Sequence, residues 1–241
     1  MKPTIIAHRG NNFEYPENTL IGLRSAFELG CTAVEFDIQM AADNSLIIIH
    51  DEDTLRTSGI AGSVFDQDYQ QLAEISIHEP ERLAEQHKPQ SISLLQDFLQ
   101  LLEEFPTAHA YIEVKEQSLK KWGHQQVIDE LIPLLANFTK QCTVISFDLP
   151  VLEMIREQSN LAIGWVLYHY DIASKESAER SKPDFLIIDQ ADLSLSAKPW
   201  QGPWEWMVYG VDSQELAFKH FDNGVNYVET DNLPAMLELQ R

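Results

Sequence analysis

The sequence predicts an α/β fold, a (β/α)8 TIM barrel with a small insertion after the early strands. Eight short apolar runs alternate with segments of helix length, an order that is typical of parallel strands joined by helices. The length of 241 residues is near the usual size of such a barrel. Apolar residues make up 44% of the chain and charged residues 23%, as in stable globular proteins. We therefore expect one domain over residues 1–241.

Each element is predicted from its pattern, apolar and β-branched runs for strands and a 3.6-residue period for helices. The predicted barrel strands are Thr4–Ala7, Ala33–Met40, Tyr111–Val114, Thr143–Ser146, Ala162–Leu167, Phe185–Ile188, Met207–Val211 and Tyr227–Thr230. The predicted helices are Leu20–Leu29, Leu94–Leu102, Val127–Leu135, Val151–Gln158, Gln214–Phe221 and Pro234–Leu239. Asn18, Ser213 and Asp231 are polar residues that suggest helix starts.

Two segments depart from the alternation. Ile47–His50 resembles a further strand, but only Ala41–Ser45 separates it from the second barrel strand. A parallel crossover needs a dozen or more residues, so this strand should return antiparallel. Residues 52–91 form a long insertion with little periodicity, which we expect at the carboxyl ends of the strands, where insertions shape access to a barrel site.

The charge balance limits the classes of partner. The 38 acidic and 17 basic residues give a net charge of −21, which repels nucleic acid and anionic lipid at long range. No apolar stretch is long enough for stable membrane insertion, and the start lacks a leader pattern, so we expect a cytoplasmic protein with a small-molecule ligand. Cys31 and Cys142 are expected to be buried thiols. Homo-oligomerisation is left open.

Charged side chains gather where the early strands end. His8 and Arg9 follow the first strand, and a lone pair of this kind is weak evidence. Glu35 and Asp37 are two residues apart, so both point to one face of their strand and repel each other. Glu113 continues the carboxylate set on the third strand. Such a set must be compensated by a cation, by a shared proton or by exposure.

Oxygen ligands of this kind suit one divalent cation, Mg2+ or Ca2+. Lys115 repeats the two-residue spacing after Glu113, so a network of salt bridges without a metal is the alternative. If a tight turn spans residues 41–45, the returning strand brings His50 near Glu35. That carboxylate would raise the pKa of His50 and suit it to the role of acid, although the sequence does not assign the two histidines.

Together these residues are the set that a phosphodiester reaction requires. A metal and cations neutralise charge on the phosphoryl oxygens, one imidazole accepts a proton from the nucleophile, and another donates one to the leaving alkoxide. The motifs in their order resemble the glycerophosphodiester phosphodiesterase family over essentially the whole chain. They are His8-Arg9-Gly10, Pro16-Glu17-Asn18-Thr19, Glu35-Phe36-Asp37, His50-Asp51 through Thr54-Leu55 and Arg56-Thr57 to Gly59, Glu113-Val114-Lys115, Ser146-Phe147 and Gly224 to Asp231.

The resemblance implies hydrolysis of glycerophosphodiesters to glycerol 3-phosphate and an alcohol, through attack of the substrate's own 2-hydroxyl and a cyclic phosphate. It implies metal binding by Glu35, Asp37 and Glu113, proton transfer by His8 and His50, and phosphate contacts by Arg9 and Lys115. It also gives Glu17 a supporting place at the site, and leaves Asn18 as a helix cap.

One motif departs from the family, which usually ends its seventh strand with Trp, Thr or a similar residue, Val and Asn. This chain has Trp206-Met207-Val208-Tyr209. Trp206 is still expected to line the pocket, whereas Tyr209 puts the substrate preference in doubt. A lysophospholipase D-like activity, a glycoside hydrolase using Glu35 and Glu113, and a non-catalytic phosphodiester-binding barrel are the alternatives.

Overall fold

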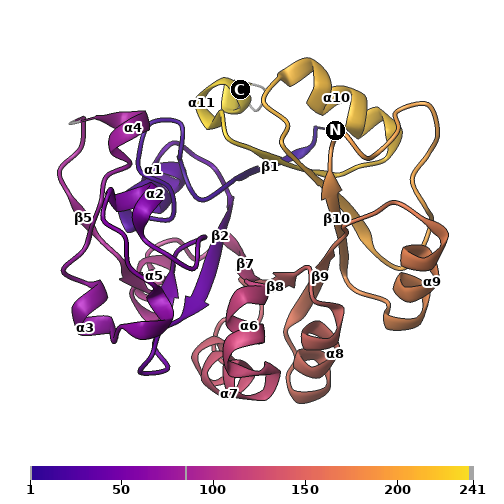
Figure 1. Ribbon diagram of the computed structural model, residues 1–241. Coiled ribbons are helices and arrows are strands. Elements are labelled where there is room, and N and C mark those ends of the chain that lie inside the picture. Colours follow the sequence, from indigo (N-terminus) through magenta and orange to yellow (C-terminus); the bar gives the residue numbers. More distant parts are fainter. Residues whose placement is uncertain (1, 85, 239–241) are drawn as a thin grey trace.

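A computed structural model describes residues 2–84 and 86–238 of the chain. In these residues eight parallel strands form the barrel, and it closes where β1 pairs with both β2 and β12 (Figure 1). In chain order the barrel strands are β1 (Thr4–Ala7), β2 (Ala33–Met40), β7 (His109–Val114), β8 (Cys142–Ser146), β9 (Ala162–Val166), β10 (Phe185–Asp189), β11 (Glu205–Tyr209) and β12 (Tyr227–Thr230). The predicted fold class is confirmed.

Helices surround the strands on the outside of the barrel (Figure 1). They are α1 (Leu20–Glu28), α5 (Leu95–Glu103), α6 (Glu116–Trp122), α7 (His124–Leu135), α8 (Leu149–Gln158), α9 (Ile172–Ser181), α10 (Gln214–Asn223) and α11 (Leu233–Leu237). The sequence prediction missed α6 and α9. In α9 only Ala178 is buried, so this helix has almost no apolar periodicity to detect. The predicted end of the last helix, Leu239, lies outside the described residues.

Two of the three predicted helix starts are wrong. Ser213 caps α10, as expected, because its hydroxyl accepts the Leu216 N–H. The cap of α1 is Thr19 and not Asn18, and α11 follows Asn232 and not Asp231. The side chains of Asn18 and Asp231 bond to residues of the barrel mouth instead.

The hairpin after β2 carries the chain beyond the barrel and back to its mouth. Strand β3 (Leu46–Ile48) runs antiparallel to β2, as predicted, and β6 (Ser93–Leu94) pairs on its other edge. The ladder ends earlier than expected: Ile38 pairs with Ile48, and the Ile49 N–H bonds to the Asp37 carbonyl. His50 therefore lies just past the strand, at the level where the barrel site begins.

The insertion consists of short helices and strands that pack around a small core of their own. Its elements are α2 (Leu55–Ser58), a 3-10 turn (Val64–Asp66), α3 (Tyr69–Leu72), β4 (Ser76–Ile77), α4 (Pro80–Leu83) and β5 (Gln90–Ser91). Val64, Phe65 and Leu72 pack against Ile47 and Ile49 of the hairpin. The insertion therefore packs on the β2–β3 hairpin beside the barrel mouth, and Figure 1 shows α2 and α4 on the same side of the barrel as α1.

The main core has two layers, one inside the barrel and one between strands and helices. Inside, the rings of Tyr111 and Phe185 meet edge to face at 5.3 Å, and Phe185 meets Tyr227 at 5.2 Å. These residues come from non-neighbouring strands, so their contacts cross the interior.

Cys31 and Cys142 are both buried, as predicted, and burial raises the pKa of the Cys142 thiol to about 12. Among the described helices, none has the length and apolar character needed to cross a membrane.

Candidate active site

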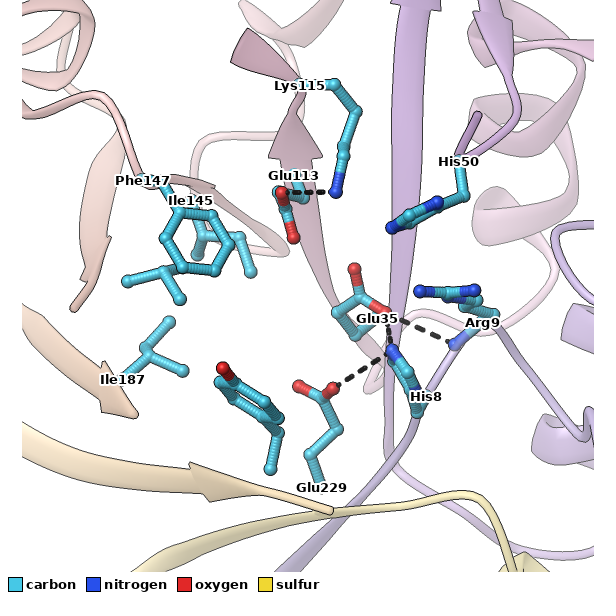
Figure 2. A pocket seen from close by; sticks show the side chains of 12 residues that line it. His8, Arg9, Glu35, His50, Glu113, Lys115, Ile145, Phe147, Ile187 and Glu229 are labelled. Atoms are coloured by element: carbon cyan, nitrogen blue, oxygen red, sulfur yellow. Dashed lines mark hydrogen bonds and ion pairs between the residues drawn. The ribbon is translucent and has the colours of Figure 1, made fainter. Parts of the chain in front are cut away.

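A pocket of about 210 Å³ opens at the carboxyl ends of the barrel strands (Figure 2). Most of the residues singled out from the sequence meet there, from β1, β2, β7 and the segment after β3. The lining comprises His8, Arg9, Glu35, His50, Glu113, Lys115, Ile145, Phe147, Val166, Ile187, Tyr209 and Glu229. Charged groups form one side of the pocket and apolar side chains the other, as Figure 2 shows.

Three carboxylates converge as the strand spacing predicts. Glu35, Asp37 and Glu113 each offer an oxygen, and these oxygens lie within 4.8 Å of one another. Glu35 Oε1 is buried and forms no hydrogen bond with any described residue. Burial, and then repulsion by Asp37, raise the pKa of Glu35 well above its ordinary value. A buried carboxylate oxygen without a donor, facing two other carboxylates, fits a divalent cation as the missing partner.

Asp37 is the carboxylate that the protein itself compensates. Arg9 Nε lies 3.2 Å from Asp37 Oδ2, and Lys115 Nζ lies 3.3 Å from Oδ1. Burial disfavours the charged form, but these two cations hold the pKa of Asp37 well below its usual range. Lys115 also lies 2.7 Å from Glu113 Oε1. Arg9 and Lys115, which were expected to contact phosphate, therefore form ion pairs with the carboxylates of the site.

The turn after β1 fixes Arg9 in this position. Arg9 has φ 54° and Gly10 has φ 82°, both in the left-handed region. A Cβ atom on Gly10 would lie 2.8 Å from the backbone of Gly22 and Leu23, so only glycine fits beneath α1. The strained turn directs the Arg9 N–H to Glu35 Oε2 at 3.2 Å. The backbone and the guanidinium thus contact different carboxylates.

Asn18 holds Asp37, a role that the sequence prediction did not find. Its amide donates to Asp37 Oδ2 at 2.9 Å and its carbonyl oxygen accepts the Asp37 N–H at 3.1 Å. This contact needs φ 55° at Asn18, a conformation that Asn tolerates better than most residues. The residue was expected to cap α1, because Asn before a helix is usually a cap.

His8 is surrounded by carboxylates on both ring nitrogens. Its Nδ1 lies 2.6 Å from Asp231 Oδ1, and its Nε2 lies 3.5 Å from Glu229 Oε1 and 3.8 Å from Glu35 Oε2. Burial opposes the charged imidazolium, but Glu229 and then Asp231 raise the pKa of His8 to about 10. Neither Glu229 nor Asp231 was proposed as a site residue, because each is one acidic residue at the end of the last strand.

The pKa of His50 shifts in the opposite direction to that of His8. Burial lowers its pKa below the ordinary value, and the attraction of Asp37 is opposed by the cations Arg9 and Lys115. The expectation that the pKa of His50 is raised is therefore wrong, because burial and then the two nearby cations outweigh the attraction of the carboxylate. His50 lines the pocket, its Nδ1 lies 2.6 Å from Asp51 Oδ1, and its Nε2 forms no hydrogen bond with any described residue.

Glu17 joins two arginines behind the site. It accepts from Arg9 at 2.9 Å and from Arg56 of the insertion at 2.7 and 2.8 Å. Arg56 also donates to Asp51, the residue that bonds to His50. Glu17 lines an adjoining groove and not the pocket itself.

Trp206 does not lie at the pocket, which corrects the prediction that it lines it. Its side chain is 3% exposed, packs in the layer between strands and helices, and donates to the Trp200 carbonyl at 2.9 Å. Met207 and Tyr209 contact the barrel interior, so the alternation of the strand turns Trp206 outward. Tyr209 reaches the pocket instead.

The fold and the site together define an enzyme of the phosphoric diester hydrolase class. The model of the glycerophosphoryl diester phosphodiesterase family matches residues 8–233. A glycerophosphodiester phosphodiesterase of Caldanaerobacter subterraneus subsp. tengcongensis is 32% identical over 248 residues, covering 100% of this chain and 99% of that protein. The chain belongs to the glycerophosphoryl diester phosphodiesterase family.

Other relatives match over less of their length or only in fold. A glycerophosphodiester phosphodiesterase of Bacillus altitudinis is 33% identical over 132 residues, about half of each chain (53% of this one and 51% of the relative). An Oleispira antarctica phosphodiesterase, solved with the product sn-glycerol-3-phosphate, has a TM-score of 0.82 at 20% identity, covering 98% of this chain and 96% of the other. A Thermotoga maritima glycerophosphodiester phosphodiesterase has a TM-score of 0.75 at 20% identity, covering 99% of each.

Proposed function

We propose that this protein hydrolyses glycerophosphodiesters to sn-glycerol 3-phosphate and an alcohol in a metal-dependent reaction. The observation that carries the proposal is a pocket in which two histidines of opposite pKa tendency flank three buried carboxylates and two cations. Family membership and the product bound to the Oleispira antarctica protein support the choice of substrate.

One divalent cation, Mg2+ or Ca2+, is proposed at Glu35, Asp37 and Glu113. The support is the unpartnered Glu35 Oε1 and the convergence of three hard oxygen donors without a thiolate. When bound, the cation neutralises charge on the phosphoryl oxygens and so stabilises the transition state. Arg9 and Lys115 are proposed to share this task at the other phosphoryl oxygens.

His50 is proposed as the base and His8 as the acid. An ionised Asp51 can only accept, so the Nδ1–H of His50 donates to it and Nε2 keeps its lone pair. His50 Nε2 takes the proton of the substrate 2-hydroxyl, whose oxygen then attacks phosphorus. In His8 both ring nitrogens face carboxylates, which favours the protonated ring, and this proton goes to the oxygen of the departing alcohol.

These transfers give a cyclic phosphate, and water opens it in a second step. His8, now neutral, takes a proton from the water, and the water oxygen attacks phosphorus. The bond to the 2-oxygen breaks, and that oxygen receives the proton held by His50. The product is sn-glycerol 3-phosphate, and both histidines return to their starting states. The nucleophile comes from the substrate, so it is already positioned next to phosphorus.

The test is a turnover assay on glycerophosphocholine and glycerophosphoethanolamine with and without chelator. Activity should disappear in excess EDTA and return with Mg2+ or Ca2+. An analogue that lacks the 2-hydroxyl should bind and not turn over. Full activity in EDTA contradicts the metal, and rapid hydrolysis of the 2-deoxy analogue contradicts the cyclic phosphate.

Residues 1–241 are proposed to form one domain, with residues 52–91 as an insertion at the barrel mouth. A cytoplasmic location is proposed from the two free, buried thiols. Limited proteolysis tests the first proposal, since a single domain should be cut first in the insertion.

A further inference from the structure

Two polar side chains of the pocket are not used by the proposed mechanism, Tyr209 and Glu229. Tyr209 is the last residue of β11 and Glu229 the last but one of the neighbouring strand β12, and the register pairs Met207 with Tyr227 and Val208 with Val228. The next row of the sheet holds Tyr209 beside Glu229, and both line the pocket. Figure 2 shows the Glu229 carboxylate directed into the pocket near His8.

Within the described residues, these two groups have hydrogen-bonding capacity to spare. The Tyr209 hydroxyl forms no hydrogen bond there, and Glu229 has only the 3.5 Å approach to His8 Nε2. Burial and nearby acidic residues raise the pKa of Tyr209 to about 12, so its hydroxyl stays protonated and can donate. Glu229 is 4% exposed. A buried carboxylate such as Glu229 is costly without further donors, so a ligand hydroxyl that donates to it is favoured, and the partly buried Tyr209 hydroxyl can donate to the same ligand.

The spaces on the two sides of His8 and Arg9 differ in size. The pocket with Tyr209 measures about 210 Å³, whereas a groove of about 730 Å³ runs from His8 and Arg9 along Asn12, Phe13 and the insertion. A cavity of roughly 150 Å³ accommodates a molecule such as benzene, so the pocket suits a glycerol unit and not a long acyl chain. The groove then receives the departing alcohol, which varies between substrates.

Resting on the proposed function, we propose that Tyr209 and Glu229 bind the terminal hydroxyl of the glycerol unit, the one that carries no phosphate. That hydroxyl donates to Glu229 and accepts from Tyr209. A 1-acyl lysophospholipid lacks this donor, because its oxygen is esterified, and its acyl chain exceeds the pocket. The pair therefore selects deacylated glycerophosphodiesters over lysophospholipids.

The size of the effect follows from the chemistry of the contact. A site built to bind a hydroxyl rejects an analogue without it, because its polar groups are left buried and unpaired. Loss of one hydrogen bond to a charged group corresponds to a change of roughly 10- to 100-fold. The wild-type kcat/KM for glycerophosphocholine should therefore exceed that for the 1-deoxy analogue, the phosphocholine diester of propane-1,2-diol, by this factor.

The test compares this ratio in wild type, Tyr209→Phe, Glu229→Gln and the matched control Tyr227→Phe. Tyr227 lies on the same strand two residues before Glu229, deeper in the barrel, and does not line the pocket. The ratio should fall toward one in the first two variants and stay at the wild-type value in the control. Any effect of Glu229→Gln on the pKa of His8 changes kcat/KM for both substrates by the same factor and so cancels in the ratio. Lysophosphatidylcholine should be a poor substrate of the wild type.

Several outcomes would overturn the assignment. They are a wild-type ratio near one, a ratio that neither variant changes, or lysophosphatidylcholine turned over as fast as glycerophosphocholine. Calorimetry with Mg2+ and Ca2+ tests whether Glu229→Gln weakens metal binding, which would make Glu229 a metal ligand instead. If the wild type hydrolyses no glycerophosphodiester, the proposed function fails, and the subsite is tested separately. Calorimetry then compares sn-glycerol 3-phosphate with its 1-deoxy analogue, and equal affinities refute the subsite.

Discussion

Replacing Glu35 by Gln should stabilise the metal-free protein while it removes metal binding and activity. Glu35 lies within 4.8 Å of Asp37 and Glu113, and its Oε1 has no described partner. At this distance and an effective dielectric constant of about 20, each pair of carboxylates repels by roughly 3 to 4 kcal/mol. Gln keeps the shape and still offers an oxygen to the Arg9 N–H, which now bonds to Oε2.

Protonation limits how much the substitution can gain. The pKa of Glu35 is raised from an ordinary value of 4.5, so the folded protein is penalised only above that pH. At pH 7 the penalty cannot exceed about 3 kcal/mol, since one pKa unit is worth about 1.4 kcal/mol. We expect Glu35→Gln to gain about 1 to 3 kcal/mol in chelator, or roughly 2–10 °C in Tm for a chain of this size. The gain should vanish near pH 4, where Glu35 is protonated in both folded and unfolded states.

Asp37→Asn is the matched control with the opposite sign. Its carboxylate is paired with the partly buried Arg9 and the buried Lys115, so its removal leaves both cations short of a partner and should cost about 3 to 5 kcal/mol. Thermal unfolding in excess EDTA, repeated with saturating Mg2+ or Ca2+, measures both variants. The metal should raise the Tm of the wild type and not that of Glu35→Gln. Destabilisation by Glu35→Gln in EDTA, or a full metal response in this variant, would refute the reasoning.

Three further predictions concern the histidines and the support of Asp37. First, His8→Ala should lose roughly 10²- to 10⁴-fold of kcat on glycerophosphocholine. It should recover much of this loss on a nitrophenyl ester of glycerol phosphate, because nitrophenolate departs without a proton. His50→Ala should not recover, and equal rescue of both variants contradicts the assignment. Second, kcat/KM should rise with pH as His50 loses its proton, below pH 6.5, and fall as His8 loses its own, near pH 10. Asp231→Asn removes the carboxylate at His8 Nδ1 and should move the falling limb to lower pH, so an unmoved limb contradicts the assignment. Third, Asn18→Ala removes two hydrogen bonds to Asp37 and should weaken metal affinity, measured by calorimetry, by about 10- to 100-fold, so an unchanged affinity argues against that support.

The barrel could be predicted from the sequence because its strands are continuous apolar runs. β1, β2 and β12 begin and end at the predicted residues, and the carboxylates of β2 and β7 converge because strand alternation fixes their face. The carboxyl ends of parallel strands meet at one edge, so residues at strand ends could be assigned to one site without any knowledge of distances.

The missed residues depend on contacts that no local pattern encodes. Asp231 bonds to His8 across 223 positions of the chain, and Glu229 approaches the same histidine from its place in β12 opposite Ile6. Asn18 resembles a helix cap in sequence, and only the left-handed turn at this residue turns its amide toward Asp37. Trp206 was assigned to the wrong face of its strand. Met207 faces the barrel interior, and because side chains alternate along a strand, its neighbour Trp206 points away from the interior.

The insertion also has a role that its lack of periodicity hid. Arg56 lies between Asp51 and Glu17, so ion pairs connect His50, the proposed base, to the carboxylate site through the insertion. The chain of contacts, each between 2.6 and 3.2 Å, runs His50–Asp51–Arg56–Glu17–Arg9–Asp37. Partly buried ion pairs of this kind hold their partners through several bonds at once, so the insertion positions the site as well as bounding the groove. A loop that only controlled access would have no reason to place a guanidinium between these two carboxylates.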